Sequence, residues 1–367
     1  MMIILRNLVA LMNMPNLQQL QTDNAIEQWN RLALKNMAKL TIAHNPALFH
    51  FFSGYLKLSA FYILIFQDEL AVGLLPLVKI GKKIVSIPHF SYGGIFWLNN
   101  TNNDFDEGQI IKHISNQILN ENLSSGFYRF NYFDNLPDDS NTQDIEVRKT
   151  NPFFGTNDTN KVTLIMSLKK NEDEQFALFN SNLRRKIKKA EKNGIKIRKG
   201  KEEIISDFTK VYNRNMQSIG SPSLGKSFFN ALLTTKNTNT EVFVAYIKDK
   251  PIGGGFCMYY GDFYENTWFS TLQEYNKLYT SYLLHDAMIK SAIEKKATTY
   301  SMGRSTKGSG AHRYKQQWQI EEKDLFFSNT LEHSFSLKDQ KWMTKIWKRL
   351  PAFFVDAAGP YFAKRLY

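Results

Sequence analysis

The first half of the chain carries three short apolar runs, two of which are joined by a polar turn. The runs cover residues 60–66, 70–79 and 83–87, and the turn is Gln67-Asp68-Glu69. Apolar runs of this length that flank a polar turn predict a β-hairpin with a third strand beside it. The other elements expected in this half are two leading helices, a helix over 106–122 and a strand over 127–133.

The second half repeats the same order of elements. Its apolar runs at 241–248 and 252–260 flank the turn Asp249-Lys250, and a third run covers 265–271. A helix over 280–295 and a strand over 298–302 complete the pattern. A repeated order of elements predicts two similar α/β (α+β) units, each with a mostly antiparallel mixed sheet flanked by helices.

The length of the chain agrees with two domains. A chain of 367 residues exceeds the usual size of one hydrophobic core. Residues 151–160 contain Pro, Gly, Asn, Asp and Thr, a composition typical of a linker. We therefore expect a first domain over 1–150, a second over 151–335 and a C-terminal segment over 336–367.

Residues 182–193, NLRRKIKKAEKN, predict a strongly basic helix with a narrow apolar stripe. Ten Lys or Arg residues and one Glu lie between Arg184 and Lys201. This surplus of positive charge favours an anionic partner, and the alternative is a solvated helix face. No aromatic residues interleave these cations and no helix-turn-helix or RNP pattern is present, so we expect no DNA partner.

The overall composition supports packed domains and an anionic partner. Hydrophobic residues make up 43% of the chain and aromatic residues 14%, which argues against disorder. The net charge of +13 favours nucleic acid, lipid headgroups or phosphorylated substrates as partners.

Cysteine and histidine usage excludes two classes of site. The single cysteine, Cys257, cannot form an internal disulfide, and the seven histidines show no HxH or HExxH spacing, so we expect no metal. The apolar stretch Met2–Met14 is interrupted by Arg6 and Asn7 and is too short to cross a bilayer. A reducing, cytosolic setting is expected.

The segment 301–319, SMGRSTKGSGAHRYKQQWQ, carries the strongest chemical signal. A Gly/Ser/Lys loop that follows a strand exposes backbone N–H groups, hydroxyls and cations within a short length of chain. This combination suits a bound phosphate or carboxylate. The alternative is a flexible surface turn with a solvated basic rim.

Five segments of the chain occur in an order that is familiar from one family. They are SIPHFSYGGIFW, SNLRRKIKKAEKNGIKI, Asn215-Met216 with Ile219–Pro222, GRSTKGSGAHRYKQQW and WKRLPAFFVDAAGPYFAKRLY. Together they resemble the FemAB-related proteins, which are relatives of the peptidoglycan Fem transferases within the GNAT acyltransferase group. The nearest resemblance is to FemAB-type proteins of bacterial exopolysaccharide and exosortase loci. It covers roughly residues 60–367 and implies tandem GNAT-like domains.

Two positions depart from the family pattern. Ser301-Met302 stand where the family has Asp-Phe before its Gly-Arg-Ser, and Gln319 stands where a glycine follows the tryptophan. If the missing Asp accepts the proton in the family, its loss would affect catalysis. The long helical arm that true Fem enzymes carry is also absent. Acyl-CoA and aminoacyl-tRNA therefore both remain open as the donor.

The resemblance implies transfer of an acyl or aminoacyl group to an amine or hydroxyl. Such a reaction needs a bound anionic donor, a stabilised oxyanion and a proton acceptor. Catalysis is expected from Asp286, His312 and Arg304, with Glu265 as a further candidate base. The residues expected to bind substrates are Tyr92, Gly93, Gly94, Arg184, Arg185, Lys188, Trp268, Ser270, Tyr279, Ser305, Ser309, Lys315 and Trp318. The alternatives are a helix-surface carboxylate for Asp286, a solvated loop residue for His312 and plain core for the aromatic residues.

The C-terminal segment predicts a basic amphipathic helix. Trp342, Ile346, Trp347 and Leu350 recur at helical spacing and are accompanied by Lys and Arg. A Trp-rich basic helix of this kind can lie on an anionic membrane, and the alternative is a helix packed on the sheet.

We therefore expect an acyltransferase in the cytoplasm or on the inner face of the cytoplasmic membrane. Its acceptor would be a saccharide or lipid-linked acceptor of the cell envelope, in exopolysaccharide or peptidoglycan-type synthesis. Two hypotheses compete with this one. The first is a non-catalytic GNAT-like module that binds a glycan or a lipid carrier. The second is an RNA-binding protein that uses the basic helix at 182–193.

Overall fold

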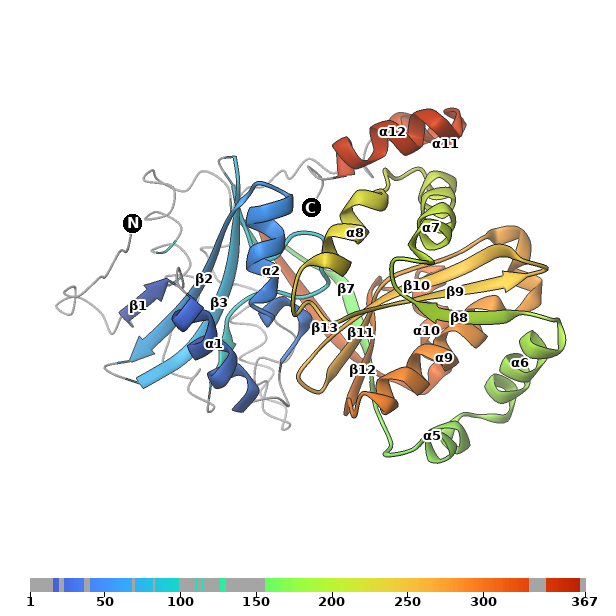
Figure 1. Ribbon diagram of the computed structural model, residues 1–367, viewed down its shortest axis with the longest axis horizontal. Helices are drawn as coiled ribbons and strands as arrows, with labels where there is room; N and C mark the ends of the chain where they lie inside the picture. The colour runs from blue at the N-terminus through green and yellow to red at the C-terminus, as the bar shows by residue number, and fades with distance from the viewer. Residues whose placement is uncertain are drawn as a thin grey trace. The chain divides into compact units, whose positions relative to one another are not determined.

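The computed structural model describes residues 16–19, 23–35, 40–67, 70–81, 83–98, 110, 114, 126–129, 156–329 and 341–363. The chain divides into two compact units, which are considered separately (Figure 1). Unit 1 comprises Met1–Thr163, Arg304–Lys307 and Lys323–Ser334, and unit 2 comprises Leu164–Gly303, Gly308–Glu322 and Phe335–Tyr367. Strands β7 (Thr156–Ser167), β12 (Thr299–Thr306) and β13 (Glu321–Asn329) each contribute residues to both units.

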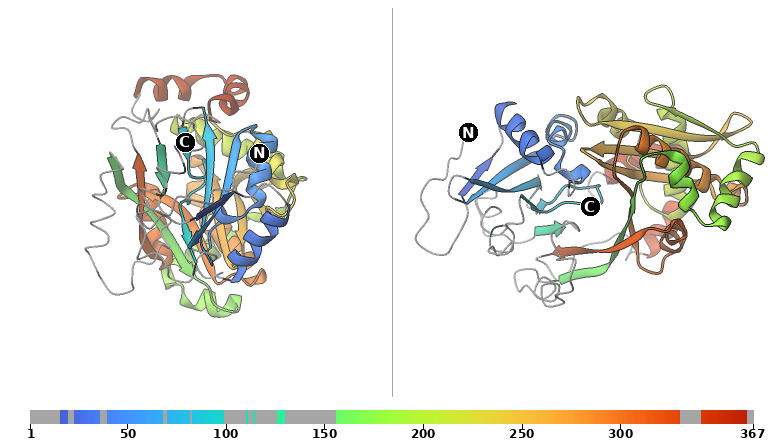
Figure 2. Two further views of the ribbon diagram at one scale, coloured as in Figure 1. Left: turned by 90° about the vertical axis from the view of Figure 1, so that its left-hand side faces the viewer. Right: turned by 90° about the horizontal axis from the view of Figure 1, so that it is seen from below.

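Unit 1 is a mixed, mostly antiparallel sheet with short helices. Its strands follow the order β1-β2-β3-β4-β6-β13, and β5 pairs with β3; only the β4–β6 pair is parallel. Helices α1 and α2 lie on one face of β2 and β3, where Trp29 of α1 packs against Tyr62 of β2 (Figure 2). The elements are β1 (Asn16–Gln19), α1 (Asp23–Lys35), α2 (Ala47–His50), β2 (Ser59–Gln67), β3 (Leu70–Ile80), β4 (Lys83–Val85), β5 (Phe96–Trp97) and β6 (Gly126–Arg129).

Unit 2 has a sheet of the same kind. Strands β8, β9, β10 and β11 pair antiparallel in sequence order, and β12 pairs parallel with β11. The elements are α5 (Glu172–Leu178), α6 (Ser181–Lys192), β8 (Lys196–Gly200), α7 (Ile205–Ile219), α8 (Lys226–Thr234), β9 (Thr240–Ile247), β10 (Lys250–Tyr260), β11 (Phe263–Thr271), the 3-10 helix η5 (Gln273–Leu278), α9 (Thr280–Glu294), α10 (Gly310–Lys315), the 3-10 helix η6 (Gln316–Trp318), α11 (Lys341–Arg349) and α12 (Ala352–Ala363).

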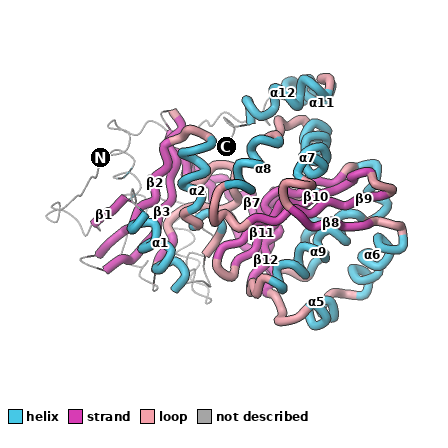
Figure 3. Tube along the Cα trace, in the orientation of Figure 1, coloured by secondary structure: helices cyan, strands magenta, loops and turns pink. Residues whose placement is uncertain are grey.

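Three consecutive glycines in β10 set the layers of unit 2. A Cβ atom at Gly253 would lie 2.8 Å from Leu284 of α9, and one at Gly254 would lie 2.9 Å from Phe208 of α7. Because successive residues of a strand face opposite sides of the sheet, α9 and α7 press on opposite faces. The missing side chains let both helices approach the strand closely. The result is three layers, with helices on both sides of the strands (Figure 3).

The face under α7 and α8 is an aromatic core. Phe208 and Phe229 of these helices contact Phe256 of β10, and the ring of Trp268 in β11 lies 5.4 Å from that of Phe229. Trp268, which the sequence analysis assigned to a substrate groove, is therefore a buried core residue. Large buried aromatic rings that pack edge to face account for much of the stability of such a layer.

The expected fold class is confirmed, and two local expectations need correction. Residues 156–160, expected in a linker, begin strand β7. The strand expected at 298–302 continues to Thr306, and helix α10 begins at Gly310, so the expected long loop reduces to residues 307–309. Most of the helix expected at 106–122, and residues 130–133, lie outside the described residues. Within the described ranges, none of the helices has the length and apolar character needed to cross a membrane.

Candidate functional site at the start of helix α9

The pairing between strands β11 and β12 ends partway along β11. Their parallel pairing runs from Phe263↔Thr299 to Glu265↔Ser301, whereas β11 continues to Thr271. On its other edge β11 carries a β-bulge: Trp268 pairs with Phe256 and Asn266 with Cys257, so Thr267 is an extra residue. Bulges redirect the backbone and are frequent next to active sites. The far half of β11 therefore has an edge to which no described strand of unit 2 is bonded.

Helix α9 begins beside this open end of β11. Its cap residue Tyr279 has φ +62°, and Thr280 in the first turn lies against the same glycine, Gly253, as Thr271 at the end of β11. The first turn of a helix offers free backbone N–H groups and the positive end of the helix dipole. The hydroxyl of Thr280 is buried and has no hydrogen-bond partner among the described residues. This arrangement suits a bound anion.

The basic helix α6 packs against α9 and places cations at its start. Lys186 Nζ donates to Gln317 Oε1 at 2.6 Å and to the hydroxyl of Tyr282, one turn into α9, at 3.1 Å. Lys189 Nζ lies 5.2 Å from the ring centroid of Tyr279, and the Asn193 side chain donates to the carbonyl of Leu278. The cations that reach α9 are therefore Lys186 and Lys189.

The three cations named in the sequence analysis lie elsewhere on α6. Arg184 donates to the carbonyl of Ala177, and Arg185 is exposed and bonds Asn182 of its own helix. Lys188 is exposed. The sequence thus predicts the helix, but Lys186 was not among the expected binding residues. Its position beside the apolar stripe Leu183–Ile187–Ala190 was the available signal.

A buried aromatic cluster lies under the first turns of α9. The ring of His285 lies 4.5 Å from that of Phe269 in β11 and 5.4 Å from that of Trp318, and its Nδ1 is 3.0 Å from the hydroxyl of Tyr300. Burial lowers the pKa of His285 well below its usual value, and the nearby Lys315 acts in the same direction. His285 is therefore neutral at physiological pH. No role was expected for His285, because nothing in its spacing indicates burial.

The segment 308–318 is held by local bonds. Ser309 caps α10 by accepting from the backbone N–H of His312. The ring of His312 accepts from the N–H of Gly308 at Nδ1, so Nε2 carries the hydrogen and donates to Glu322 at 2.8 Å. Lys315 donates to the carbonyl of Gly303 at 3.0 Å. Both ring nitrogens of His312 are occupied, which disfavours a role as general base.

Several residues assigned by sequence to the same site fall in unit 1. Arg304 is exposed and donates to the carbonyl of Phe90 at 3.3 Å, and Ser305 is buried. The hydroxyl of Tyr92 lies 2.5 Å from that of Thr163. Ser86 fills the space where Gly93 would carry a Cβ and accepts from the N–H of Gly94. Within unit 1 these residues form a loop-and-strand structure that is distinct from the start of α9.

The expected bases differ in their surroundings. Asp286 is buried on α9 and pairs with Lys290 Nζ at 2.8 Å. Burial raises its pKa, and Lys290 acts in the opposite direction. Glu265 is fully buried. It is the last residue of β11 that pairs with β12, and it lies two residues before the bulge. Ser270, near the end of the same strand, accepts from Asn215 of α7.

The two departures from the family pattern have local explanations. Ser301 and Met302 are buried, and the Ser301 hydroxyl accepts from the N–H of Gly303 at 2.9 Å. Gln319 adopts φ +53°, a left-handed conformation that glycine occupies without steric cost. A glycine after the tryptophan is thus the easier residue at this turn.

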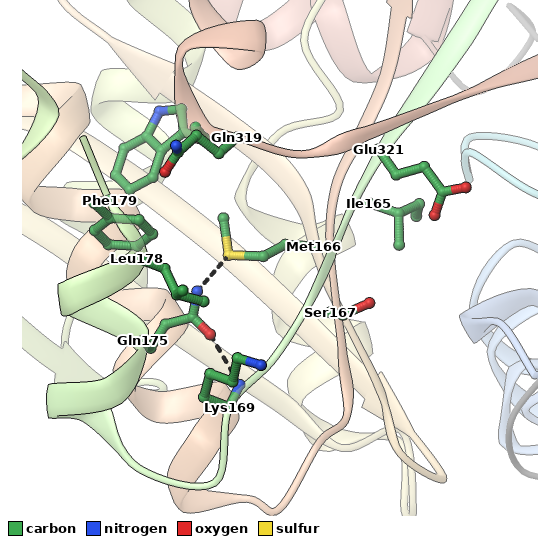
Figure 4. Close-up of a pocket in the computed structure, with 10 residues that line it drawn as sticks. Ile165, Met166, Ser167, Lys169, Gln175, Leu178, Phe179, Gln319 and Glu321 are labelled. Atoms are coloured by element: carbon green, nitrogen blue, oxygen red, sulfur yellow. Dashed lines mark hydrogen bonds between the residues drawn. The ribbon is translucent and has the colours of Figure 1, made fainter.

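A pocket of about 280 Å³ lies between β7, α5 and the turn after η6 (Figure 4). Met166, Phe179 and Trp318 supply apolar walls, while Lys169, Gln175 and Glu321 bring polar groups. The Gln175 amide is fixed by Met166 Sδ and by the N–H of Lys169. Trp318 also stacks on Tyr282 at 6.1 Å, so this pocket adjoins the start of α9. In the described part of the chain, no three His, Cys, Asp or Glu side chains converge as metal ligands.

The residues that form this site match a known protein family. Residues 178–316, which span α6 to α10, match the family model of the GNAT acetyltransferase domain. No curated protein matches the chain significantly. The second unit is therefore similar to GNAT acetyltransferase domains over these residues, which supports acyl transfer as the general activity.

Solved structures match over most of the chain. FemX is 13% identical with a TM-score of 0.57 and covers 84% of this chain and 96% of its own. A tandem GNAT protein from the clavulanic acid biosynthesis pathway is 9% identical with a TM-score of 0.52, over 87% and 100%. L-PGS from Bacillus licheniformis is 12% identical with a TM-score of 0.50, over 90% and 98%. At these identities the likeness concerns the fold, which is that of Fem-like tandem GNAT proteins.

Proposed function

We propose that this protein, whose second unit is similar to GNAT acetyltransferase domains, transfers an acyl or aminoacyl group from an anionic donor to an amine or hydroxyl of a cell-envelope saccharide. The donor is a coenzyme A thioester or an aminoacyl-tRNA. The observation that carries the proposal is that β11 and β12 stop pairing after Glu265, next to the bulge at Thr267 and beside the start of α9.

The start of α9 is proposed to hold the phosphates of the donor. Four features support this role: the positive end of the helix dipole, the buried hydroxyl of Thr280, and the cations Lys186 and Lys189. A phosphate-bearing donor is anchored there while its acyl end extends along the free edge of β11.

The backbone at the bulge is proposed to stabilise the oxyanion. Attack on the donor's acyl carbon puts negative charge on its carbonyl oxygen, and N–H groups fixed by the fold stabilise that charge without reorganisation. Thr267 is the residue that the bulge leaves without a counterpart in β10. Its N–H is therefore the candidate donor to the oxyanion.

Glu265 is proposed as the general base. Glu265 is a buried carboxylate at the point where the pairing of β11 with β12 ends, next to the proposed oxyanion site at the bulge. In this scheme the acceptor's nitrogen or oxygen bonds to the acyl carbon while Glu265 takes its proton. The donor's C–S or C–O bond breaks, and the coenzyme A sulfur leaves as a thiolate, whereas the tRNA oxygen leaves with the proton that Glu265 returns to it.

The pocket beside Trp318 is proposed to bind the acceptor. Ligand pockets typically combine apolar and aromatic walls with a few polar groups that fix orientation. Here Leu178 offers an exposed apolar side chain to a sugar ring, and Lys169 and Glu321 offer partners for its hydroxyl or amino groups.

Donor turnover tests the proposal. Purified protein is incubated with glucosamine as the acceptor and with one donor at a time: acetyl-CoA, a longer acyl-CoA or charged tRNA. Release of thiol or of free tRNA is measured. Glu265→Gln should lower kcat by about 10²-fold or more, because a positioned base contributes about 10²–10⁴. Asp286→Asn, which alters another buried carboxylate, should retain most of the activity.

Two results would contradict the proposal. One is donor turnover by the folded protein that Glu265→Gln leaves unchanged. The other is tight glycan binding with no turnover of any donor, which favours the non-catalytic module.

A further inference from the structure

Helices α11 and α12 are fixed to unit 2 along one side. The Gln217 side chain of α7 donates to the carbonyl of Leu350 at 2.7 Å, and Asp356 of α12 bonds Arg214 and Asn213 of the same helix. Three close approaches at glycines tighten the contact: Gly220 against Thr344, Gly359 against Ser223 and Gly225 against Pro360. The two helices are therefore an ordered part of the unit (Figure 1).

The opposite side of the same helices carries exposed large apolar side chains. Trp342 and Ile346 lie one turn apart on α11, and Phe353 and Tyr361 lie two turns apart on α12. Phe353 is 76% exposed and Trp342 60%. Six of the ten exposed large hydrophobic residues among the described residues lie on these two short helices, so the exposure is concentrated rather than scattered.

Positive charge accompanies this surface. Lys345, Lys348 and Arg349 are exposed, and the first and last of them lie on the same side of α11 as Trp342 and Ile346. The only acidic residue in 341–367 is Asp356, and Arg214 neutralises it. We call the surface formed by Trp342, Lys345, Ile346, Arg349, Phe353 and Tyr361 the C-terminal face.

We propose that the C-terminal face docks on an anionic lipid surface, with its aromatic and aliphatic side chains in the headgroup region and its cations on the lipid phosphates. Exposed apolar groups alone would also fit a protein partner. Cations lie among these apolar groups, and the one acidic residue of the segment is already paired with Arg214. This combination favours a negatively charged bilayer, because such a surface offers both an apolar interior and negative charge. A second copy of this face would bring like charges together.

Vesicle co-sedimentation of the full chain tests this inference. Vesicles contain either equal parts of phosphatidylglycerol and phosphatidylcholine or phosphatidylcholine alone. The wild type should bind the first and not the second. The double variant W342S/F353S should lose most of this binding, whereas Leu70→Ser, which removes an equally exposed side chain of unit 1, should not.

The role of charge is tested separately. The triple variant K345Q/K348Q/R349Q should bind several-fold less to the anionic vesicles. The matched triple variant K196Q/K201Q/K236Q removes the same charge from other exposed positions and should bind like the wild type. Thermal unfolding verifies that each variant is folded. Quenching of Trp fluorescence by brominated lipid, reduced in Trp342→Phe, reports insertion directly.

Three results would overturn the inference. The first is equal sedimentation of wild type and W342S/F353S. The second is an equal loss in the two charge variants, which would indicate unlocalised attraction. The third is a dimer in solution that W342S/F353S dissociates, which would make the face a protein interface. No donor or acceptor is present in these assays, so their outcome is independent of the proposed activity.

Discussion

The two ends of helix α9 differ in whether the charged side chains beside them are paired with an opposite charge. At its C-terminal end, buried Glu241 accepts hydrogen bonds from Tyr264 (2.7 Å) and Ser291 (2.6 Å) and pairs with Lys199 at 3.0 Å. At its N-terminal end, Lys186 bonds only neutral oxygens and Lys189 lies over a ring, with no described carboxylate in ion-pair range of either.

This contrast separates structural charge from binding charge. The Glu241 network neutralises its own cations, and burial of a fully bonded pair fixes the sheet against the helix. At the other end, no described carboxylate balances the charge of Lys186 and Lys189, which lie beside a helix N-terminus. Our account therefore assigns stability to one end of α9 and donor binding to the other.

The largest effect is expected from Glu241→Ala. The variant removes one of the two carboxylate partners of the half-exposed Lys199 and leaves the buried hydroxyls of Tyr264 and Ser291 without their acceptor. Leaving a buried polar group unsatisfied costs about 1–3 kcal/mol. The free energy of unfolding, measured in urea, should fall by that amount.

Glu294→Ala is the matched control for this variant. Glu294 pairs with the same Lys199 at 3.2 Å but is exposed, so its loss should cost under about 0.5 kcal/mol. Equal losses in the two variants would mean that the buried network is not what stabilises this end.

A smaller effect, on binding rather than stability, is expected from Lys186→Ala. Loss of one phosphate-facing cation should weaken donor binding about tenfold, or about 1.4 kcal/mol. Titration calorimetry with the active donor measures the change. Lys188→Ala, from the exposed side of the same helix, should bind the donor like the wild type. Equal weakening in both variants would reduce the role of α6 to general attraction.

An effect of comparable size to that of Lys186→Ala is expected only when the pH is varied, because the two ends differ in pH dependence. The lowered pKa of His285 means that the unfolded chain takes up a proton below about pH 6.5 while the folded chain does not. Stability is therefore lost as pH falls through this window. The pKa of Glu241 is lowered on balance by its bonds to Ser291, Tyr264 and Lys199, which together outweigh its desolvation. Its contribution is lost only below about pH 4.3.

Urea unfolding at a series of pH values tests this order. Buried His44 of unit 1, whose pKa falls to about 3, contributes in the same window as His285. His285→Asn should therefore reduce the slope between about pH 6.5 and 5 by about 1.4 kcal/mol per unit without abolishing it. A slope unchanged in this variant would contradict the burial of a neutral imidazole beside α9.

Much of this arrangement follows from local sequence pattern. The hairpins, helix α9 and the basic helix all have the expected type, because alternation, turn residues and the stripe Leu183–Ile187–Ala190 are local signals. The strand start at 156–160 was missed because Thr and Asn at this point resemble a linker, and its place in the sheet depends on pairing with distant strands.

The site itself was only partly predictable. The Gly/Ser/Lys segment marks the right region of the chain, but β12 carries Arg304 into unit 1, and Ser309 and Lys315 bond their own backbone surroundings. The bulge at Thr267 has no sequence signature, since it arises from how β10 and β11 align. Lys186 differs from its neighbouring lysines only in its angle around the helix.

Hydrogen exchange measured with and without the active donor tests the central claim most directly. The account predicts donor-induced protection in peptides that contain 265–271 and 279–283, and unchanged exchange in peptides covering 196–200 and 291–295. Protection at the Glu241 end of α9, or none at either segment near its start, would contradict the assignment of donor binding to the start of α9.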